Sequence, residues 1–415
     1  MSQGDYTFLE DLDDEHLALA QIAVDRKDYS SALELAEDFL EERPLSVEAL
    51  NLCAVAASGL GDDQKALSIY RKAIQLDPAN GALHHNYGVL LEKLGSLSQA
   101  LEHFWKAHKL QPDFPEAFIN LGNVLDELNR TEEALQMYFR ALHRQPGSVD
   151  IHYNVGYALN RLGRYLEALS HFDIALELSP GDTACMNGRG FSLAGLGKDR
   201  EALEAYSAAI TLEPETAIYH FNLGLSLTRL GQIEEALAAF DRVLELDPGS
   251  HEARIERAQL LTTTGRFPQA LKELDRAAEL DPDGTDPIFY RAMVFEAMGD
   301  LESALENLEE CLKRDPDSLF VLNNKGNALM DLGRLDEALD CFDTILSSSD
   351  RYPLAHYNRA CVMARQGRVA EAVAALEAAA RQERHFIRDA ENDPDFDPIR
   401  RKPSFVNLLD RLDRD

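Results

Sequence analysis

Apolar residues of two sizes recur along this chain in a fixed register. Alanine occurs every 34 residues from Ala32 to Ala372, and glycine or alanine occurs at the same interval from Ala20 to Ala360. In every period after the first, a large apolar residue follows the alanine of the first series by four positions. Small side chains at fixed points let two helix backbones approach closely, and a larger one fills the space beside them. Each period is therefore predicted to fold as two packed helices.

Glycine and proline mark the ends of these helices. When residues are counted from 13 in units of 34, proline stands at position 32 in nine successive units, from Pro44 to Pro316, and glycine stands at position 15 in nine. Glycine tolerates the left-handed conformation that closes a helix, and so does Asn129, which takes position 15 in another unit. Proline ends the second helix and presets the turn that follows. Residues 13–386 are thus predicted to form eleven units without insertion or deletion.

This pattern resembles the tetratricopeptide repeat family over about nine tenths of the chain. It departs from the family pattern at position 4, where residues such as His84 and Met186 replace the usual large aromatic. The resemblance implies an all-α fold, a right-handed α-α superhelix of eleven antiparallel helix pairs, with a concave face lined by the first helix of each pair. We expect an acidic tail at 1–12, the repeats at 13–386, and a C-terminal segment at 387–415 with a capping helix.

Asparagine recurs at position 6 of the first helix, although it is a mediocre helix former. The six residues are Asn86, Asn120, Asn154, Asn222, Asn324 and Asn358. In this respect the chain resembles peptide-binding tetratricopeptide receptors, including the peroxisomal import receptor and the superhelix of O-linked N-acetylglucosamine transferase. In those receptors, asparagines on successive repeats hydrogen-bond to the main chain of the ligand. One carboxamide both donates and accepts, so it pairs with a peptide unit whatever side chain that unit carries. The alternative is that these asparagines cap or crosslink neighbouring helices.

Aromatic residues accompany the asparagines at positions 5 and 9, which lie one helical turn apart and share a side of the helix. The residues predicted to bind a peptide are the six asparagines above together with Asn123, Tyr153, Tyr157, Phe221 and Asn327. Nearby acids such as Glu116, Asp126 and Glu127 favour a partner segment with apolar and basic side chains. For the aromatics at position 5, packing against the adjacent hairpin is the alternative.

The chain is strongly acidic, with 73 acidic and 41 basic residues and a net charge of −32. Phosphate backbones and anionic lipids are repelled by such a charge, so we expect no nucleic-acid partner. No stretch is long and apolar enough for a transmembrane helix, and residues 1–14 are too acidic for a secretory signal, so we expect no membrane insertion. A cytoplasmic protein is the resulting expectation.

Candidate chemistry outside the asparagines is sparse. The five cysteines are scattered without ligand spacing, so we expect reduced thiols in core or groove positions. Histidine recurs at position 4, as His84, His152, His220 and His356, at separations of two hairpins or more. At roughly 20 Å these side chains cannot share a metal ion, and packing between helices is their expected role. No catalytic set lies outside the repeats, so we expect no enzyme, no cofactor and no metal site.

Two interpretations of function remain open. The first is a protein–protein interaction adaptor that holds an extended peptide or partner segment in the groove between about repeats 3 and 7. The alternative is a self-assembling scaffold in which one solenoid docks on another as a homo-oligomer. A further expectation concerns Gly188 and Gly195, which lie inside a predicted first helix and each cost roughly 1 kcal/mol relative to alanine. Their hairpin is predicted to be the least stable of the array against local opening.

Overall fold

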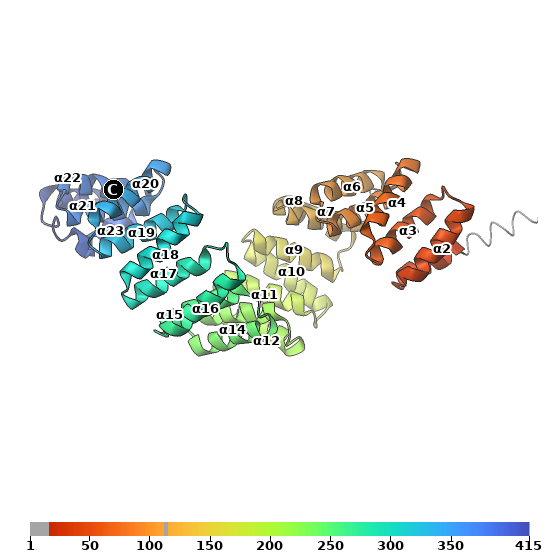
Figure 1. The fold of residues 1–415 in the computed structure, drawn as a ribbon, viewed down its shortest axis with the longest axis horizontal. Helices are drawn as coiled ribbons and strands as arrows, with labels where there is room; N and C mark the ends of the chain where they lie inside the picture. The colour runs from red at the N-terminus through yellow and green to blue at the C-terminus, as the bar shows by residue number, and fades with distance from the viewer. Residues whose placement is uncertain (1–15, 112–114, 415) are drawn as a thin grey trace, which may run out of the picture. The chain divides into compact units, whose positions relative to one another are not determined.

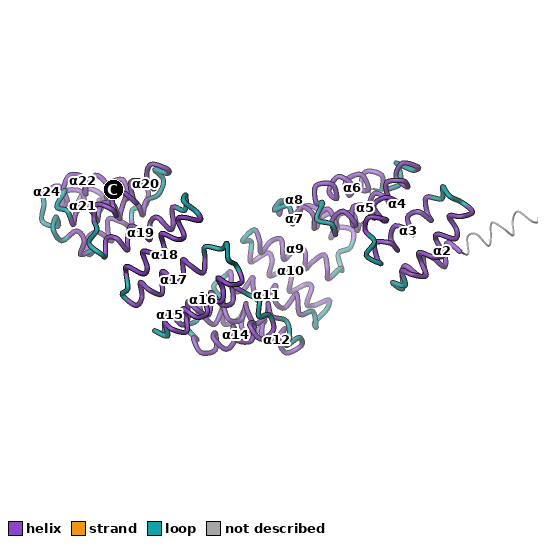
Figure 2. The backbone as a smooth tube through the Cα atoms, viewed as in Figure 1, coloured by secondary structure: helices purple, strands orange, loops and turns teal. Residues whose placement is uncertain are grey.

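The structure is a computed structural model that describes residues 16–111 and 115–414. All regular secondary structure in these residues is helical, and short loops join consecutive helices (Figure 1, Figure 2). The chain divides into two compact units, Met1–Pro214 and Glu215–Asp415. The acidic tail expected at 1–12 lies outside the described residues.

The first unit consists of helix pairs. Its helices are the segment 16–25, α2 (Tyr29–Glu42), α3 (Val47–Gly59), α4 (Asp63–Leu76), α5 (Gly81–Lys93), α6 (Leu97–Leu110), α7 (Pro115–Glu127), α8 (Thr131–Arg144), α9 (Val149–Arg161), α10 (Tyr165–Leu178), α11 (Thr183–Gly195) and α12 (Asp199–Leu212). From α3 on, each first helix packs on the second helix of its own pair, and each second helix from α2 to α10 packs on the first helix of the next pair.

The second unit continues the same pattern and adds a C-terminal segment. Its helices are α13 (Ala217–Arg229), α14 (Ile233–Leu246), α15 (His251–Thr263), α16 (Phe267–Leu280), α17 (Asp286–Met298), α18 (Leu301–Arg314), α19 (Leu319–Asp331), α20 (Leu335–Ser348), α21 (Pro353–Arg365), α22 (Val369–Gln382), α23 (His385–Asn392), the short 3-10 helix η1 (Pro394–Phe396) and α24 (Pro403–Arg414). The two units together contain the eleven antiparallel pairs that the period predicts.

The turn within each pair has one conformation throughout. Position 15 has a positive φ in every pair, between 71° and 86° for the nine glycines and 59° for both Lys27 and Asn129. The left-handed turn predicted at this position is therefore confirmed, and Lys27 adopts it without the conformational freedom of glycine. At the start of several first helices a serine or aspartate caps the helix, as where Ser148 accepts a hydrogen bond from the Ile151 amide.

The small residues of the repeat let aromatic rings pack against the first helices. The alanine at position 20 is fully buried in all eleven pairs. In the fifth pair a Cβ added to Gly156 would lie 2.8 Å from the ring of Phe172, which is itself fully buried. Glycine is therefore required where this ring approaches, as the size pattern in the sequence predicts. The five cysteines are also buried, and none is in a disulfide.

The C-terminal segment packs against the last helix pair. Phe405 and Leu408 of α24 are buried in one cluster with residues of α21 and α22. The Tyr357 hydroxyl donates to Asp393 at 2.7 Å, and the Arg365 guanidinium lies 2.6 Å from a carboxylate oxygen of Asp395. These bonds tie the segment before α24 to the first helix of the pair. Burial and the bond to Asp393 raise the pKa of Tyr357, so its hydroxyl stays a donor at neutral pH.

Candidate functional site

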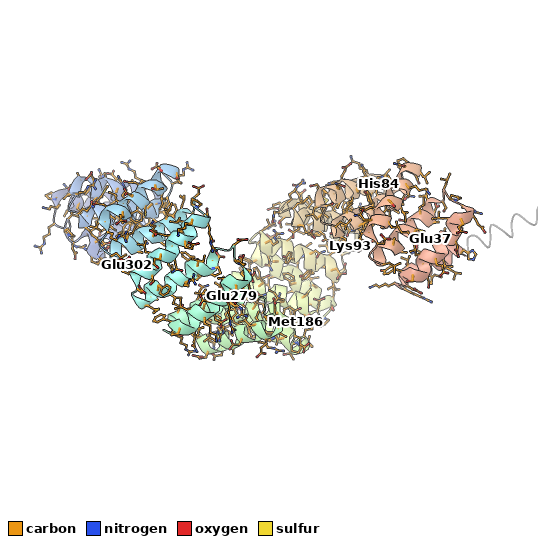
Figure 3. All side chains as sticks on the ribbon, viewed as in Figure 1. Glu37, His84, Lys93, Met186, Glu279 and Glu302 are labelled. Atoms are coloured by element: carbon orange, nitrogen blue, oxygen red, sulfur yellow. The ribbon has the colours of Figure 1, made fainter. Side chains whose placement is uncertain are left out.

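The predicted binding residues lie on first helices, at positions 5, 6 and 9. We call the surface formed by these three positions the first-helix face, and describe it separately in each unit. The side chains that cover the helices are drawn in Figure 3, where His84 and Lys93 mark two turns of α5. Positions 5 and 9 lie one turn apart, so their side chains are neighbours along each helix.

In the first unit, two predicted asparagines bond to the preceding first helix. Asn86 donates to the side-chain oxygen of Asn51 at 3.0 Å, and the amide nitrogen of Asn120 lies 3.4 Å from Nε2 of His85. Both bonds span 35 residues, which is one hairpin plus one residue. These two amides therefore crosslink consecutive hairpins, the alternative role that the sequence left open, and only their remaining hydrogen-bonding capacity is available to a ligand.

The other two asparagines of the first unit differ from each other. Asn123 accepts a hydrogen bond from the Tyr138 hydroxyl at 2.9 Å, within its own hairpin. Asn154 is half-buried and has no hydrogen bond to any residue among those described in this unit. Its carboxamide therefore keeps both its donors and its acceptor for a partner molecule.

Aromatic side chains lie on the same helix as Asn154 and on the next first helix. The rings of Tyr153 and Tyr157 stack with centroids 6.2 Å apart, and Tyr157 is 49% exposed. On the next first helix Phe191 is 46% exposed and its ring lies 6.5 Å from that of Tyr165. Tyr153 also meets Phe172 edge to face, so the packing role left open for position 5 applies to this ring. Tyr157 and Phe191 each expose about half of an aromatic side chain to water.

In the second unit the asparagines form a bonded cluster. Asn358 is buried and donates to the side-chain oxygens of Asn323 at 3.0 Å and Asn327 at 2.9 Å. Asn324 donates instead to the Phe320 carbonyl of its own helix at 2.8 Å. Asn222, the remaining predicted asparagine of this unit, is buried. The cluster joins α19 to α21. Most of these amides therefore hold the first helices in place by internal hydrogen bonds.

Two clefts of the second unit are lined by apolar residues together with acids such as Glu252 and Asp389. Phe221 packs edge to face on Phe240 and lines a cleft of about 360 Å³ together with Ile218. A second cleft, of about 580 Å³, lies between α21 and α23, where Tyr357 stacks on Phe386. Each cleft is large enough for one apolar side chain of a bound segment.

Two pairs of histidines lie inside hairpins of the first unit. Nδ1 of His84 is 2.9 Å from Nδ1 of His103, and its Nε2 is 3.1 Å from the Pro78 carbonyl oxygen. Because a carbonyl only accepts, His84 carries its proton on Nε2 and His103 donates to it. Burial lowers the pKa of His103 to about 4, with smaller contributions from His84 and Lys106. His152 and His171 repeat the arrangement at 3.0 Å, so the expected packing role of these histidines agrees with their contacts.

Several residues of the face were missed from sequence. Asn51 and Asn323 bond to predicted asparagines, but position 5 holds too many residue types for a pattern to single them out. Phe320 at position 2 is 58% exposed and its ring lies 5.0 Å from that of Phe289. Position 2 varies from acid to aromatic along the repeats, so only its exposure in the fold identifies Phe320.

Three models described as tetratricopeptide repeat match the chain. One matches residues 17–81, 119–183, 189–251, 290–353 and 323–385, another residues 227–293, and a third residues 69–102. The first of these covers more than half of the chain. The protein therefore belongs to the tetratricopeptide repeat family, whose stacked helix pairs form a scaffold for protein–protein interaction. A comparison with curated proteins finds no match.

Solved structures similar to the chain include yeast Tom70, which is 15% identical with a TM-score of 0.49 over 98% of this chain and 96% of that one. The Cut9–Hcn1 hetero-tetramer of APC/C matches at 14% identity and a TM-score of 0.47, over 99% and 96% of the two chains. YrrB, described as a TPR protein with an unusual peptide-binding site, is 27% identical with a TM-score of 0.36 over 45% of this chain and 97% of that one. At these TM-scores the likenesses carry no conclusion about function.

Within residues 16–111 and 115–414, none of the helices combines the length and the apolar composition needed to cross a membrane.

Proposed function

We propose that this protein is a non-catalytic adaptor that binds an extended segment of a partner protein on its first-helix face. The observation that carries the proposal is Asn154, an amide without a hydrogen bond to a described residue of its unit, one turn from the half-exposed ring of Tyr157, with the half-exposed ring of Phe191 on the next first helix. An amide with free donors and acceptor pairs with a peptide backbone, and exposed rings take apolar side chains. Repeat proteins of this family are typically non-catalytic, which agrees with the choice of an adaptor.

The predicted binding residues take two roles in this proposal. In the first unit Asn154 and Tyr157 contact the ligand directly, and in the second unit Phe221 offers a separate apolar contact. Asn86, Asn120, Asn123, Asn222, Asn324, Asn327 and Asn358, with Tyr153, hold the face in shape and offer their remaining lone pairs and protons. An amide bond to ligand contributes about 0.5–1.5 kcal/mol net, and burying a half-exposed ring about 1–2 kcal/mol. A micromolar affinity corresponds to about 8 kcal/mol, so the segment spans several hairpins.

The partner segment carries apolar and basic side chains. The apolar ones suit the exposed rings of Tyr157 and Phe191, and the basic ones suit the acidic charge that the chain carries throughout. Electrostatic attraction of this kind raises the rate of association and falls as salt is added. Binding is therefore expected to weaken between low and physiological ionic strength.

The test uses a peptide selected by the wild-type protein from a displayed random library, measured by fluorescence polarisation. Asn154→Ala combined with Tyr157→Ala is expected to weaken binding roughly tenfold or more and to change the melting temperature little, because neither side chain is hydrogen-bonded to a described residue and Tyr157 loses only its half-exposed stacking on Tyr153. Asn358→Ala is the matched control. It is expected to lower the melting temperature, because it leaves the buried oxygens of Asn323 and Asn327 without their donor.

Two outcomes would contradict the proposal. One is equal binding of the selected peptide to the wild type and the double variant. The other is a sedimentation coefficient that increases with protein concentration in the wild type and not in the double variant. This result would favour the self-assembling scaffold, because a second copy of the chain would then cover the exposed rings.

A further inference from the structure

Position 2 of the first helices differs between the two units. In the first unit it is always an acid or alanine, whereas the second unit has large apolar residues there in three pairs, namely Ile218, Phe320 and Leu354. All three side chains are exposed. Phe320 and Leu354 lie on α19 and α21, consecutive first helices that contact each other. Exposed apolar residues gathered in this way are typical of a binding surface.

Leu354 lines the larger of the two clefts of the second unit, which lies between α21 and α23 (Figure 1). The buried rings of Tyr357 and Phe386 stack with their centroids 4.9 Å apart and form its apolar wall. The Tyr357 hydroxyl bonds to Asp393 at 2.7 Å, which holds this wall in place. A volume of about 580 Å³ lies within the roughly 300–1,000 Å³ of ligand sites. The cleft is therefore formed before a ligand binds.

One buried amide keeps an acceptor in this cleft. Asn358 lines the cleft and is only 9% exposed. Its amide nitrogen donates to Asn323 at 3.0 Å and to Asn327 at 2.9 Å, so both of its N–H groups are used. No described residue donates to its side-chain oxygen, so this oxygen is left to accept from a ligand. A ligand that brings an N–H group satisfies it, whereas a wholly apolar ligand leaves it without a donor.

The charged side chains of the cleft are acidic. Glu383 and Asp389 are exposed and line it, and the described residues around it include neither lysine nor arginine. His385 lies between the two acids, with Nδ1 3.4 Å from Glu383 and Nε2 3.8 Å from Asp389. The cleft thus combines an apolar wall, a buried acceptor and negative charge. These features favour a ligand that is apolar at one point and carries a hydrogen-bond donor and a positive charge beside it.

The smaller cleft of the second unit has the same register. Ile218, Phe221 and Asp247 line it at positions 2, 5 and 31 of their pair, which are the positions of an apolar, an aromatic and an acidic residue of the larger cleft. An apolar residue at position 2 therefore accompanies a cleft in both places. Only the larger cleft has a further wall from α23, the helix that follows the last repeat.

We propose that the cleft between α21 and α23 binds a large apolar side chain of a partner segment in which the next residue is lysine or arginine. The apolar side chain packs on Leu354 and Phe386, and its main-chain N–H donates to the side-chain oxygen of Asn358. The basic neighbour pairs with Glu383 or Asp389. The inference rests on the proposed function and adds a second contact region with its own sequence preference.

Other segments fit this cleft less well. A carboxylate would be repelled by Glu383 and Asp389 and would bring no donor to Asn358. A basic segment without an apolar residue would leave the exposed part of Leu354 in water and gain little from the aromatic wall. The net charge of −32 draws basic segments to the protein before any contact forms.

The first experiment uses fluorescein-labelled peptides of repeating serine, leucine and lysine on the full chain, measured by fluorescence polarisation. N-methylation of the leucines removes the N–H that Asn358 accepts and is expected to weaken binding roughly five- to tenfold. N-methylation of the serines is the matched control and is expected to have less effect. With photo-leucine in the peptide, cross-links are expected on α21 and α23. Equal losses from the two methylations, or cross-links confined to other helices, would overturn the proposal.

The second experiment changes the apolar contact. Leu354→Ala is expected to weaken binding of the serine–leucine–lysine peptide roughly threefold or more, because it removes part of the surface that covers the bound leucine. Leu166→Ala makes the same change at an exposed leucine of α10, outside the cleft, and is expected to bind as the wild type does. Equal binding by the two variants would contradict the assignment of Leu354.

The third experiment tests the charges. The wild type is expected to prefer lysine over acetyl-lysine, which carries no charge, by roughly fivefold at low salt. Glu383→Gln combined with Asp389→Asn is expected to abolish this preference. Glu132→Gln combined with Glu204→Gln removes two exposed acids of other helices and is expected to keep most of it. An equal loss in the two double variants would show a general charge effect and overturn the proposal.

The two proposals fail in different ways. If a peptide selected from a library binds through Asn154 and Tyr157 and the serine–leucine–lysine peptide does not bind, the proposed function stands and the cleft does not have this preference. If no peptide binds, both proposals fall. If the wild type associates with itself in sedimentation and Leu354→Ala does not, a second copy of the chain occupies the cleft, which would also overturn the inference.

Discussion

Gly188 allows a direct test of packing against helix propensity. From propensity alone, Gly188→Ala in the interior of α11 is expected to stabilise the protein by about 1 kcal/mol. In the structure, a Cβ at this position would lie 2.4 Å from Cζ and 2.5 Å from Cε1 of Phe172. Ordinary contacts of this kind begin near 3.4 Å, so the ring must move by about 1 Å. Phe172 is fully buried and also packs on Gly156, which leaves it no direction in which to move freely.

The size of the effect follows from these contacts. Overpacking a core typically costs 1–3 kcal/mol, and a ring held between two backbones belongs at the upper end of that range. Subtracting about 1 kcal/mol for the better helix propensity of alanine leaves a net destabilisation of about 1–2 kcal/mol. Neighbouring repeats have asparagine at this position, which would suggest Gly188→Asn as a stabilising change. The contact with Phe172 makes that substitution unfavourable as well.

Amide hydrogen exchange across residues 183–195 is the appropriate assay, because a repeat array opens locally and a single global transition does not report on one hairpin. Exchange in Gly188→Ala is expected to be faster than in the wild type. Gly181→Ala is the control, since nothing lies within 4 Å of the added Cβ. Phe172→Leu combined with Gly188→Ala is expected to recover part of the loss. Slower exchange in Gly188→Ala than in the wild type would show that propensity outweighs the ring contact.

Two predictions concern pH, and their signs are opposite. The raised pKa of Glu92 favours its protonated form in the folded protein, so this stability is present below pH 4.5 and is lost as pH rises through about 7. Glu92→Gln is therefore expected to stabilise the protein by about 1–2 kcal/mol at pH 8, after solvent screening, and much less at pH 4, as measured by urea unfolding. The lowered pKa of His103 acts in the other direction, so its stability is present above pH 6.5 and is lost as pH falls towards 4. Exchange in α6 is expected to accelerate over that range in the wild type and less in His103→Asn; an equal acceleration in both would assign the acid sensitivity to other groups.

The fold was predictable from sequence because each of its determinants repeats. The alanine at position 20 and the left-handed residue at position 15 recur in every hairpin, so one physical argument serves eleven times. The exceptions are residues outside the repeat. Helix α23 and the turn η1 follow the last hairpin, and their positions depend on bonds such as Tyr357 to Asp393 that occur once. The tight packing of Phe172 on Gly188 was also missed, because it joins two different hairpins.

The candidate site was predictable only as a set of positions. Periodicity places Asn154 and Asn358 at the same position of their helices, and both were predicted to bind a peptide. In the structure Asn358 is buried and bonded to two amides of the preceding hairpin, whereas Asn154 is half-buried and keeps its hydrogen-bonding groups. Asn358 bonds to the asparagines 35 and 31 places earlier, Asn323 and Asn327. For Asn154 the residue 35 places earlier is Ile119, and Asn123, 31 places earlier, accepts from the Tyr138 hydroxyl instead. A pattern read within one repeat does not contain this information.

The same comparison explains how an array of nearly identical hairpins acquires a local binding site. Neighbour contacts hold the stack together, and several polar side chains of the first helices are used in crosslinks such as Arg161 to Asp126. A site arises where a crosslink is missing, because the groups left without a partner keep their capacity to bond. Asn154 is such a group, because no described residue of its unit bonds to it. Adding a crosslink is expected to stabilise the stack, so Glu127→Arg is expected to raise the melting temperature, because its guanidinium can bond the Glu92 carbonyl as Arg161 bonds that of Asp126. An unchanged or lower melting temperature would contradict this account of the crosslinks.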